Sequence, residues 1–161
     1  MKKTILAIGI LAGLFLKLFI LDFLHISGSS MYPNLKNGET VVVNKLAYGL
    51  VVPFKGRFFL QWQEPKNDQT VIFLHDNKIV VKRVYGQSGT HLDFLKNSQY
   101  ILKVRDFEVP LTEEQYNNLH SFEQVPKGYV LVLGDNFSES VDSRDYGFVS
   151  VKNITGKIIG R

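Results

Sequence analysis

Two hydrophobic patterns divide the chain near residue 24. Residues 4–24 form an almost unbroken apolar run, TILAIGILAGLFLKLFILDFL, and Lys2 and Lys3 precede it. A helix rises about 1.5 Å per residue, so this run would span roughly 31 Å, close to the hydrocarbon thickness of a bilayer. Because cytoplasmic flanks carry the positive charges, the pattern predicts a single-pass anchor in the cytoplasmic membrane with its N-terminus inside.

A cleavable leader is the alternative interpretation of this segment. Lys17 and Asp22 interrupt the run, although Lys17 lies in its outer half and can extend toward the head groups. No small-x-small cleavage site follows, because residues 22–26 read DFLHI. We therefore expect residues 1–24 to be a cytoplasmic N-terminus and an uncleaved transmembrane helix, and residues 25–161 to be an extracytoplasmic domain.

The remainder of the chain has the pattern of a β domain. Short β-branched and aromatic runs alternate with turn residues, and their lengths are typical of strands. Asp76 and Asn77 separate two of these runs and predict a tight hairpin. Thr112 and Gln115 form a capping-box pair that predicts one helix. We expect a mostly β, antiparallel domain in which residues 90–126 are a smaller and less regular insert. The predicted strands are 40–44, 70–74, 79–85, 100–104 and 129–133.

Composition narrows the function classes without naming one. Hydrophobic residues make up 45% and charged residues 21%, as in globular proteins. The net charge of +4 is mild and includes no block of five like charges, so a nucleic-acid partner is not expected. Cysteine is absent, which excludes disulfides and a cysteine nucleophile. No phosphate-binding glycine loop or histidine metal motif occurs, so we predict no cofactor and no metal site.

Residues 57–62, RFFLQW, allow two interpretations. Three large apolar aromatic side chains in six residues are typical of a core strand. They are equally typical of an apolar rim that contacts the membrane interface, where tryptophan is favoured.

Three stretches carry candidate chemistry. Residues 27–33 read SGSSMYP, which alone would be a small-residue loop beside the membrane. Lys82 lies within VVKRV, where strand alternation places it on one face with Val80 and Val84. Its ammonium must therefore either extend to water or lose its hydration. Residues 134–147, GDNFSESVDSRDYG, are a polar loop whose simplest interpretation is a solvated turn with internal Asp–Arg pairing.

Together these stretches resemble the bacterial type I signal peptidases, or leader peptidases, which are serine peptidases with a Ser–Lys dyad. The first family motif, S-G-x-S-M-x-P, places its nucleophilic serine before methionine, at Ser30. The second, K-R-x-x-G, places its general base at Lys82. The third, G-D-N-x-x-x-S-x-D-S-R-x-x-G, matches at every fixed position. Residues 44–49, NKLAYG, also resemble a family segment, so the resemblance covers nearly the whole chain.

The resemblance implies supporting roles for four further positions. Ser140 corresponds to a serine that hydrogen-bonds and orients the catalytic lysine. Asp142 and Arg144 correspond to a structural ion pair behind the site. Gly28 stands where many members carry a serine that stabilises the oxyanion, so this chain lacks that side-chain donor. Ser29 is a candidate replacement.

A lysine base also requires a physical explanation, because it must be neutral to accept a proton. At an ordinary pKa near 10.4, only about one lysine in a thousand is neutral at neutral pH. Burial against apolar neighbours disfavours the ammonium and lowers the pKa. The valines around Lys82 make its strand a suitable place for such burial.

The resemblance also implies the substrate. The family cleaves signal peptides from preproteins after small-x-small sequences such as Ala-x-Ala, and the substrate is expected to lie extended beside the Lys82 strand. The expected partners are preprotein signal peptides and the phospholipid membrane, and we expect a monomer. The candidate pocket walls, each of which could equally be ordinary core, are Ile26, Met31, Leu35, Val80 and Val81.

Two departures from the family pattern leave alternatives open. Residues 67–73 read NDQTVIF and residues 86–90 read GQSGT, where the family usually has RGDIVVF and GLPGD. A specialised peptidase for a few substrates, such as pilins or conjugation proteins, is one alternative. A second class is a non-catalytic homologue that binds preproteins or serves as a membrane-anchored scaffold; loss of Ser30 or Lys82 would favour it, and both residues are present. A self-cleaving repressor is disfavoured by the anchor and by the lack of a DNA-binding helix pair.

Overall fold

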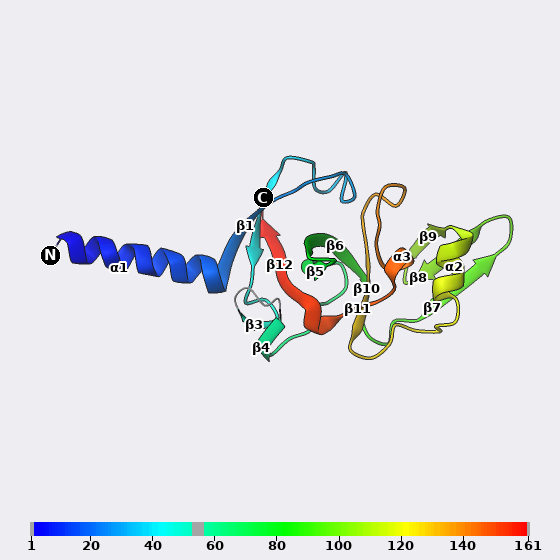
Figure 1. Cartoon of the computed structure of the whole chain (residues 1–161). Helices are drawn as coiled ribbons and strands as arrows, with labels where there is room; N and C mark the ends of the chain where they lie inside the picture. Colours follow the sequence, from blue (N-terminus) through cyan, green and yellow to red (C-terminus); the bar gives the residue numbers. More distant parts are fainter. Residues whose placement is uncertain (1, 53–56, 161) are drawn as a thin grey trace.

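A seven-stranded antiparallel sheet forms the centre of the molecule (Figure 1). The computed structural model describes residues 2–52 and 57–160. Each strand of this sheet is antiparallel to its neighbour, so the predicted mostly β, antiparallel fold is confirmed. In sheet order, the strands are β1 (Leu21–His25), β2 (Thr40–Asn44), β12 (Ile154–Gly160), β5 (Thr70–His75), β6 (Lys78–Gly86), β10 (Tyr129–Leu133) and β11 (Val149–Ser150).

The β5–β6 hairpin forms as the sequence predicts. His75 pairs with Lys78, and the two residues between them, Asp76 and Asn77, adopt φ values of 47° and 59°. Two consecutive residues in the left-handed region are typical of the two-residue turns that match strand twist. This turn fixes the register of β6 against β5 and thereby places Lys82 opposite Val71.

The insert is more regular than the sequence indicates. β7 (Leu92–Lys96), β8 (Tyr100–Val104) and β9 (Phe107–Leu111) form a three-stranded antiparallel meander, followed by α2 (Glu113–Leu119). The predicted capping box is present, because Thr112 and Gln115 exchange side-chain and backbone hydrogen bonds. The expectation of a less regular insert is therefore wrong. In Figure 1 the insert lies at the opposite end of the molecule from the N-terminal helix.

The N-terminal apolar run is not helical throughout. It forms α1 (Lys2–Phe15) and a π-helical segment, η1 (Leu16–Ile20), and then pairs with β2 as strand β1. The predicted helix to residue 24 is thus wrong at its C-terminal end, because Asp22 forms an ion pair with Lys45 at 2.9 Å and the backbone joins the sheet. Among the described residues, no helix has both the length and the apolar character that a membrane crossing requires.

Two short strands extend from the sheet after β2. β3 (Gly49–Val52) and β4 (Arg57–Gln61) form a separate antiparallel pair. Phe59, Leu60 and Trp62 remain 78%, 59% and 54% exposed, so the core interpretation is wrong for these three side chains.

Candidate active site

The loop between β1 and β2 carries Ser30 over a small apolar cluster. Met31 and Leu35 are buried in this cluster together with Ile26 and Val41. The Ile26 carbonyl accepts the Gly38 N–H at 2.9 Å, which closes the base of the loop. Burial of Met31 fixes the residue next to Ser30, whereas Ser30 itself stays partly exposed.

Lys82 lies near the middle of β6 and is only 4% exposed. Burial lowers the pKa of its amine below the ordinary value of 10.5, since a desolvated ammonium is disfavoured. The Asp142 carboxylate opposes this decrease in pKa, and the Arg144 guanidinium adds to it. The predicted loss of hydration at Lys82 is therefore present in the structure.

Ser30 and Lys82 line the same pocket, which has a volume of about 220 Å³. We call it the Ser30–Lys82 pocket. Four of the five predicted wall residues, Ile26, Met31, Val80 and Val81, also line it. The fifth, Leu35, is only 6% exposed and packs in the core beneath the loop, so its core interpretation holds. The other lining residues are Leu24, His25, Ser27 and Ile79.

Ser140 approaches the backbone of Ser30. A Cβ atom on Gly134 would collide with both the Ser140 hydroxyl and the Ser30 carbonyl, so the close approach requires glycine there. The Ser30 carbonyl accepts the Asn136 N–H at 3.0 Å. The Ser140 hydroxyl is buried and has no hydrogen-bond partner among the described residues, so the predicted bond to Lys82 is not formed in this structure.

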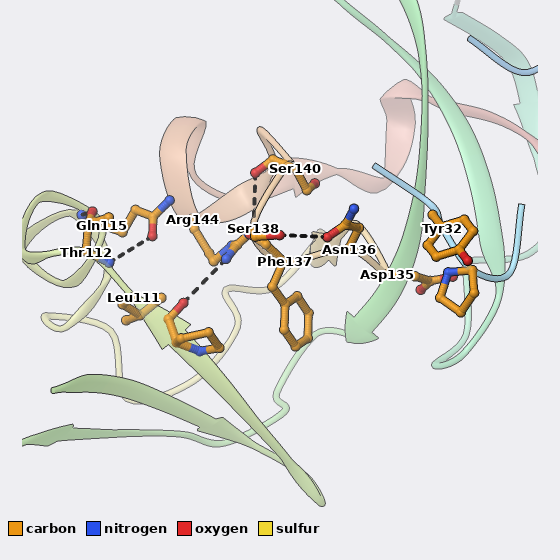
Figure 2. Close-up of a pocket in the computed structure, with 12 residues that line it drawn as sticks. Tyr32, Leu111, Thr112, Gln115, Asp135, Asn136, Phe137, Ser138, Ser140 and Arg144 are labelled. Atoms are coloured by element: carbon orange, nitrogen blue, oxygen red, sulfur yellow. Dashed lines mark hydrogen bonds between the residues drawn. The ribbon is translucent and has the colours of Figure 1, made fainter. Parts of the chain in front are cut away.

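Asp142 and Arg144 form the ion pair that the resemblance implies. They are 0% and 2% exposed, so the Asp–Arg pairing expected within this loop is present, but the pair is buried rather than solvated. Asp142 Oδ1 accepts Arg144 Nε at 2.9 Å, and Asp142 Oδ2 accepts the Gly134 N–H at 3.0 Å. Arg144 also donates to the carbonyls of Phe137 and Ser140 at 2.9 and 3.1 Å, which holds the loop that carries Ser140 (Figure 2).

A second ion pair was not predicted. Arg83 donates through Nε and Nη2 to the two carboxylate oxygens of Asp135, each at 2.7 Å. Asn34 donates to the same carboxylate at 2.9 Å. These bonds join β6, the loop after β10 and the Ser30 loop. Arg83 and Asp135 each stand in a recognised motif, but only the fold shows that they meet.

Each of the two residues before Ser30 donates a hydrogen bond. The Gly28 N–H donates to Asn37 Oδ1 at 3.0 Å, and Gly28 itself has a φ of 96°, a left-handed conformation that favours glycine. The Ser29 hydroxyl donates to the Glu139 carboxylate. While that contact lasts, Ser29 cannot serve as the replacement oxyanion donor.

Known proteins resemble this chain over most of its length. The family model described as "Signal peptidase, peptidase S26" matches residues 1–161. The chain belongs to this family. Signal peptidase I of Bacillus caldolyticus is 31% identical over 158 residues, which cover 89% of this chain and 80% of that protein. Signal peptidase IB of Staphylococcus aureus strain Mu50 is 32% identical over 162 residues, covering 87% of this chain and 76% of the relative.

More distant relatives are also found. Thylakoidal processing peptidase 1 of Arabidopsis thaliana is 29% identical and aligns with 84% of this chain and 40% of its own length. The crystal structure of a signal peptidase I from Enterococcus faecalis matches 60% of this chain and 98% of that chain, with 22% identity and a TM-score of 0.43. Membership of the signal peptidase family confirms the predicted enzyme class, a serine peptidase.

Proposed function

We propose that the chain is a membrane-bound serine endopeptidase that removes signal peptides from exported preproteins, with Ser30 as nucleophile and Lys82 as general base. One observation carries the assignment of the dyad. Lys82 is buried, its amine pKa is lowered, and it lines the same pocket as Ser30. A neutral amine beside a serine hydroxyl is what this type of catalysis requires.

Acylation begins when the neutral Lys82 amine takes the proton of the Ser30 hydroxyl. The Ser30 oxygen attacks the scissile carbonyl, and the backbone N–H of Ser30 stabilises the resulting oxyanion. As the tetrahedral intermediate collapses, the C–N bond breaks and the Lys82 ammonium returns its proton to the leaving amine. The signal peptide is then an ester on Ser30, and Lys82 is neutral again.

Deacylation repeats these steps with water. Lys82 accepts a proton from the attacking water, and the intermediate expels the Ser30 oxygen, which recovers that proton. The signal peptide leaves with a free carboxylate. The Asp142–Arg144 pair supports this cycle by holding the Ser140 loop against the Ser30 backbone, where the Ser140 hydroxyl is free to orient the Lys82 amine.

The pairing of β6 supports an extended substrate. Residues 78–83 of β6 pair with β5 on one side, whereas the pairs with β10 begin only at Arg83. The other edge of β6 before Arg83 borders the Ser30–Lys82 pocket, across which lie residues 24–27. A peptide strand can add to this edge. The apolar pocket of about 220 Å³ favours the small side chains of an Ala-x-Ala sequence.

The exposed apolar surface supports a membrane location. α1 projects away from the sheets in Figure 1, and Ile5, Leu6 and Leu11 are each about two-thirds exposed. Water disfavours such a helix, and lipid accommodates it. We propose that the N-terminal segment anchors the chain in the cytoplasmic membrane with its N-terminus inside, and that the β domain acts outside as a monomer.

A defined preprotein tests this function. The full chain in detergent is incubated with a preprotein that carries one Ala-x-Ala site, and the products are analysed by mass spectrometry. We expect cleavage directly after the second alanine. Tryptophan in place of that alanine should abolish cleavage, because the small pocket excludes it. Absence of cleavage, or equal cleavage of both preproteins, would refute the proposal.

A further inference from the structure

A second and larger hollow adjoins the Ser30 loop (Figure 2). We call it the loop groove, and its volume is about 670 Å³. Three segments far apart in the sequence form its walls: Tyr32 and Pro33 after Ser30, Pro110 and Leu111 at the end of β9, and Phe137 and Ser138 after β10. The insert and the central domain thus both contribute to it.

The loop groove and the Ser30–Lys82 pocket are lined by consecutive residues of the Ser30 loop. Ser30 and Met31 line the Ser30–Lys82 pocket, whereas the next two residues, Tyr32 and Pro33, line the loop groove. Asn136 lies in the wall of the groove, and its N–H holds the Ser30 carbonyl at 3.0 Å. The Ser30 loop therefore borders two hollows, the Ser30–Lys82 pocket up to Met31 and the loop groove from Tyr32 onward.

The walls indicate an uncharged occupant. Two charged residues line the loop groove, and both are already compensated: Asp135 by Arg83 at 2.7 Å and Arg144 by Asp142 at 2.9 Å. The remaining walls are apolar and aromatic side chains, such as Leu111, Tyr32 and Phe137, and neutral polar groups. A charged side chain placed there would lose hydration without gaining an unpaired opposite charge.

We propose that the loop groove binds the residues that directly follow the scissile bond, at the start of the mature protein, and that it favours uncharged side chains there. This inference rests on the proposed function, because it assigns the Ser30–Lys82 pocket to the signal peptide half of the substrate. The leaving half then extends from Ser30 into the loop groove. Binding energy gained there positions the scissile carbonyl.

One exposed residue permits a sharp test. In Ser138→Arg, a cation enters the wall of the groove at a surface position. Two substrates are compared: the complete preprotein, and the same signal peptide sequence ending in a nitroanilide at the scissile bond, which has no residues to occupy the groove. We expect kcat/KM to fall about tenfold or more for the preprotein and to stay unchanged for the nitroanilide.

A control and a rescue make the outcome specific. Ser98→Arg makes the same chemical change on the exposed β7–β8 turn and should leave both substrates unaffected. A preprotein with aspartate directly after the scissile bond should regain activity with Ser138→Arg, because the new guanidinium pairs with it.

Two results would overturn the inference: an equal loss for both substrates, or no loss for either. If the wild-type chain cleaves neither substrate, the proposed function itself fails.

Discussion

Under the proposed function, stability and activity oppose each other at Lys82. Burial disfavours its ammonium and lowers its pKa, and the proposed general base needs the neutral amine that this shift favours. In the folded chain the pKa of Lys82 lies below its ordinary value of 10.5. At a pH between the lowered pKa and 10.5, the unfolded chain therefore binds more protons than the folded chain. The contribution of Lys82 to stability therefore rises with pH from the lowered pKa up to 10.5.

This linkage predicts the behaviour of Lys82→Met. The variant should be inactive. At mildly acidic pH it should melt at a higher temperature than the wild type, by about 2–4 °C for each kcal/mol gained in the free energy of unfolding. The difference should shrink at alkaline pH, where the wild-type amine is neutral in both states. Thermal melts of the full chain in detergent measure it, with the exposed Lys36→Met as control. A difference that does not depend on pH would contradict desolvation of the ammonium as its cause.

The sequence reveals the residues of the site unequally. Lys82 is recognisable on physical grounds, because a lysine on an apolar strand face needs an explanation. Ser30 is recognisable only through the motif around it. The contacts of Ser29 with Glu139 and of Arg83 with Asp135 join residues more than 50 positions apart, and no local pattern indicates them.

The loop after β10 depends on one buried pair. Asp142 and Arg144 satisfy each other and bind backbone groups of four other residues, Pro110, Gly134, Phe137 and Ser140. This buried arrangement differs from a surface ion pair, whose contribution to the free energy of unfolding is usually below about 1 kcal/mol.

Arg144→Met tests this role. The substitution leaves the Asp142 carboxylate buried without its partner, so the free energy of unfolding should fall by about 3–5 kcal/mol. Arg105→Met is a matched control, because it removes an equally short ion pair, with Asp68 at 2.9 Å, at an exposed site. Denaturant unfolding of the full chain in detergent should show a loss of at most about 1 kcal/mol for the control. Equal losses would contradict the special role of the buried pair.

Strands are predicted correctly from the sequence where the hydrophobic pattern is uniform. All five predicted strands occur within about one residue of their expected bounds. β1 is missed because its apolar residues continue the helical run, and only pairing with β2 makes them a strand. β9 contains Pro110, which disfavours a strand assignment, and β12 contains Gly156 and Gly160 at its register shifts.

At the scale of the whole molecule, two segments in particular expose large apolar side chains. Large apolar side chains are exposed to solvent on α1 and also on β4 and just after it, where Phe59 and Trp62 lie. Apolar exposure of this kind marks an interaction surface. The sequence indicates the apolar character of both segments, but the choice between core and surface for residues 57–62 needed the fold.

Trp62 reports directly on membrane contact, because it is the only tryptophan in the chain. In vesicles that contain brominated lipids, its fluorescence should be strongly quenched relative to ordinary lipids. The control combines Trp62→Phe with Phe122→Trp, which moves the reporter to the insert and should remove most of the quenching. Equal quenching at both positions, or at neither, would argue against contact between this segment and the bilayer.

The central claim is that Ser30 and Lys82 act as one catalytic unit. The most direct measurement is kcat/KM for one preprotein with the wild type, Ser30→Ala, Lys82→Ala and the double variant. Each single substitution should lower kcat/KM by about a thousandfold or more, and the double variant should lose no more than either, because residues that act as a unit are not additive. Near-normal activity in either single variant, or losses that multiply in the double variant, would contradict the dyad.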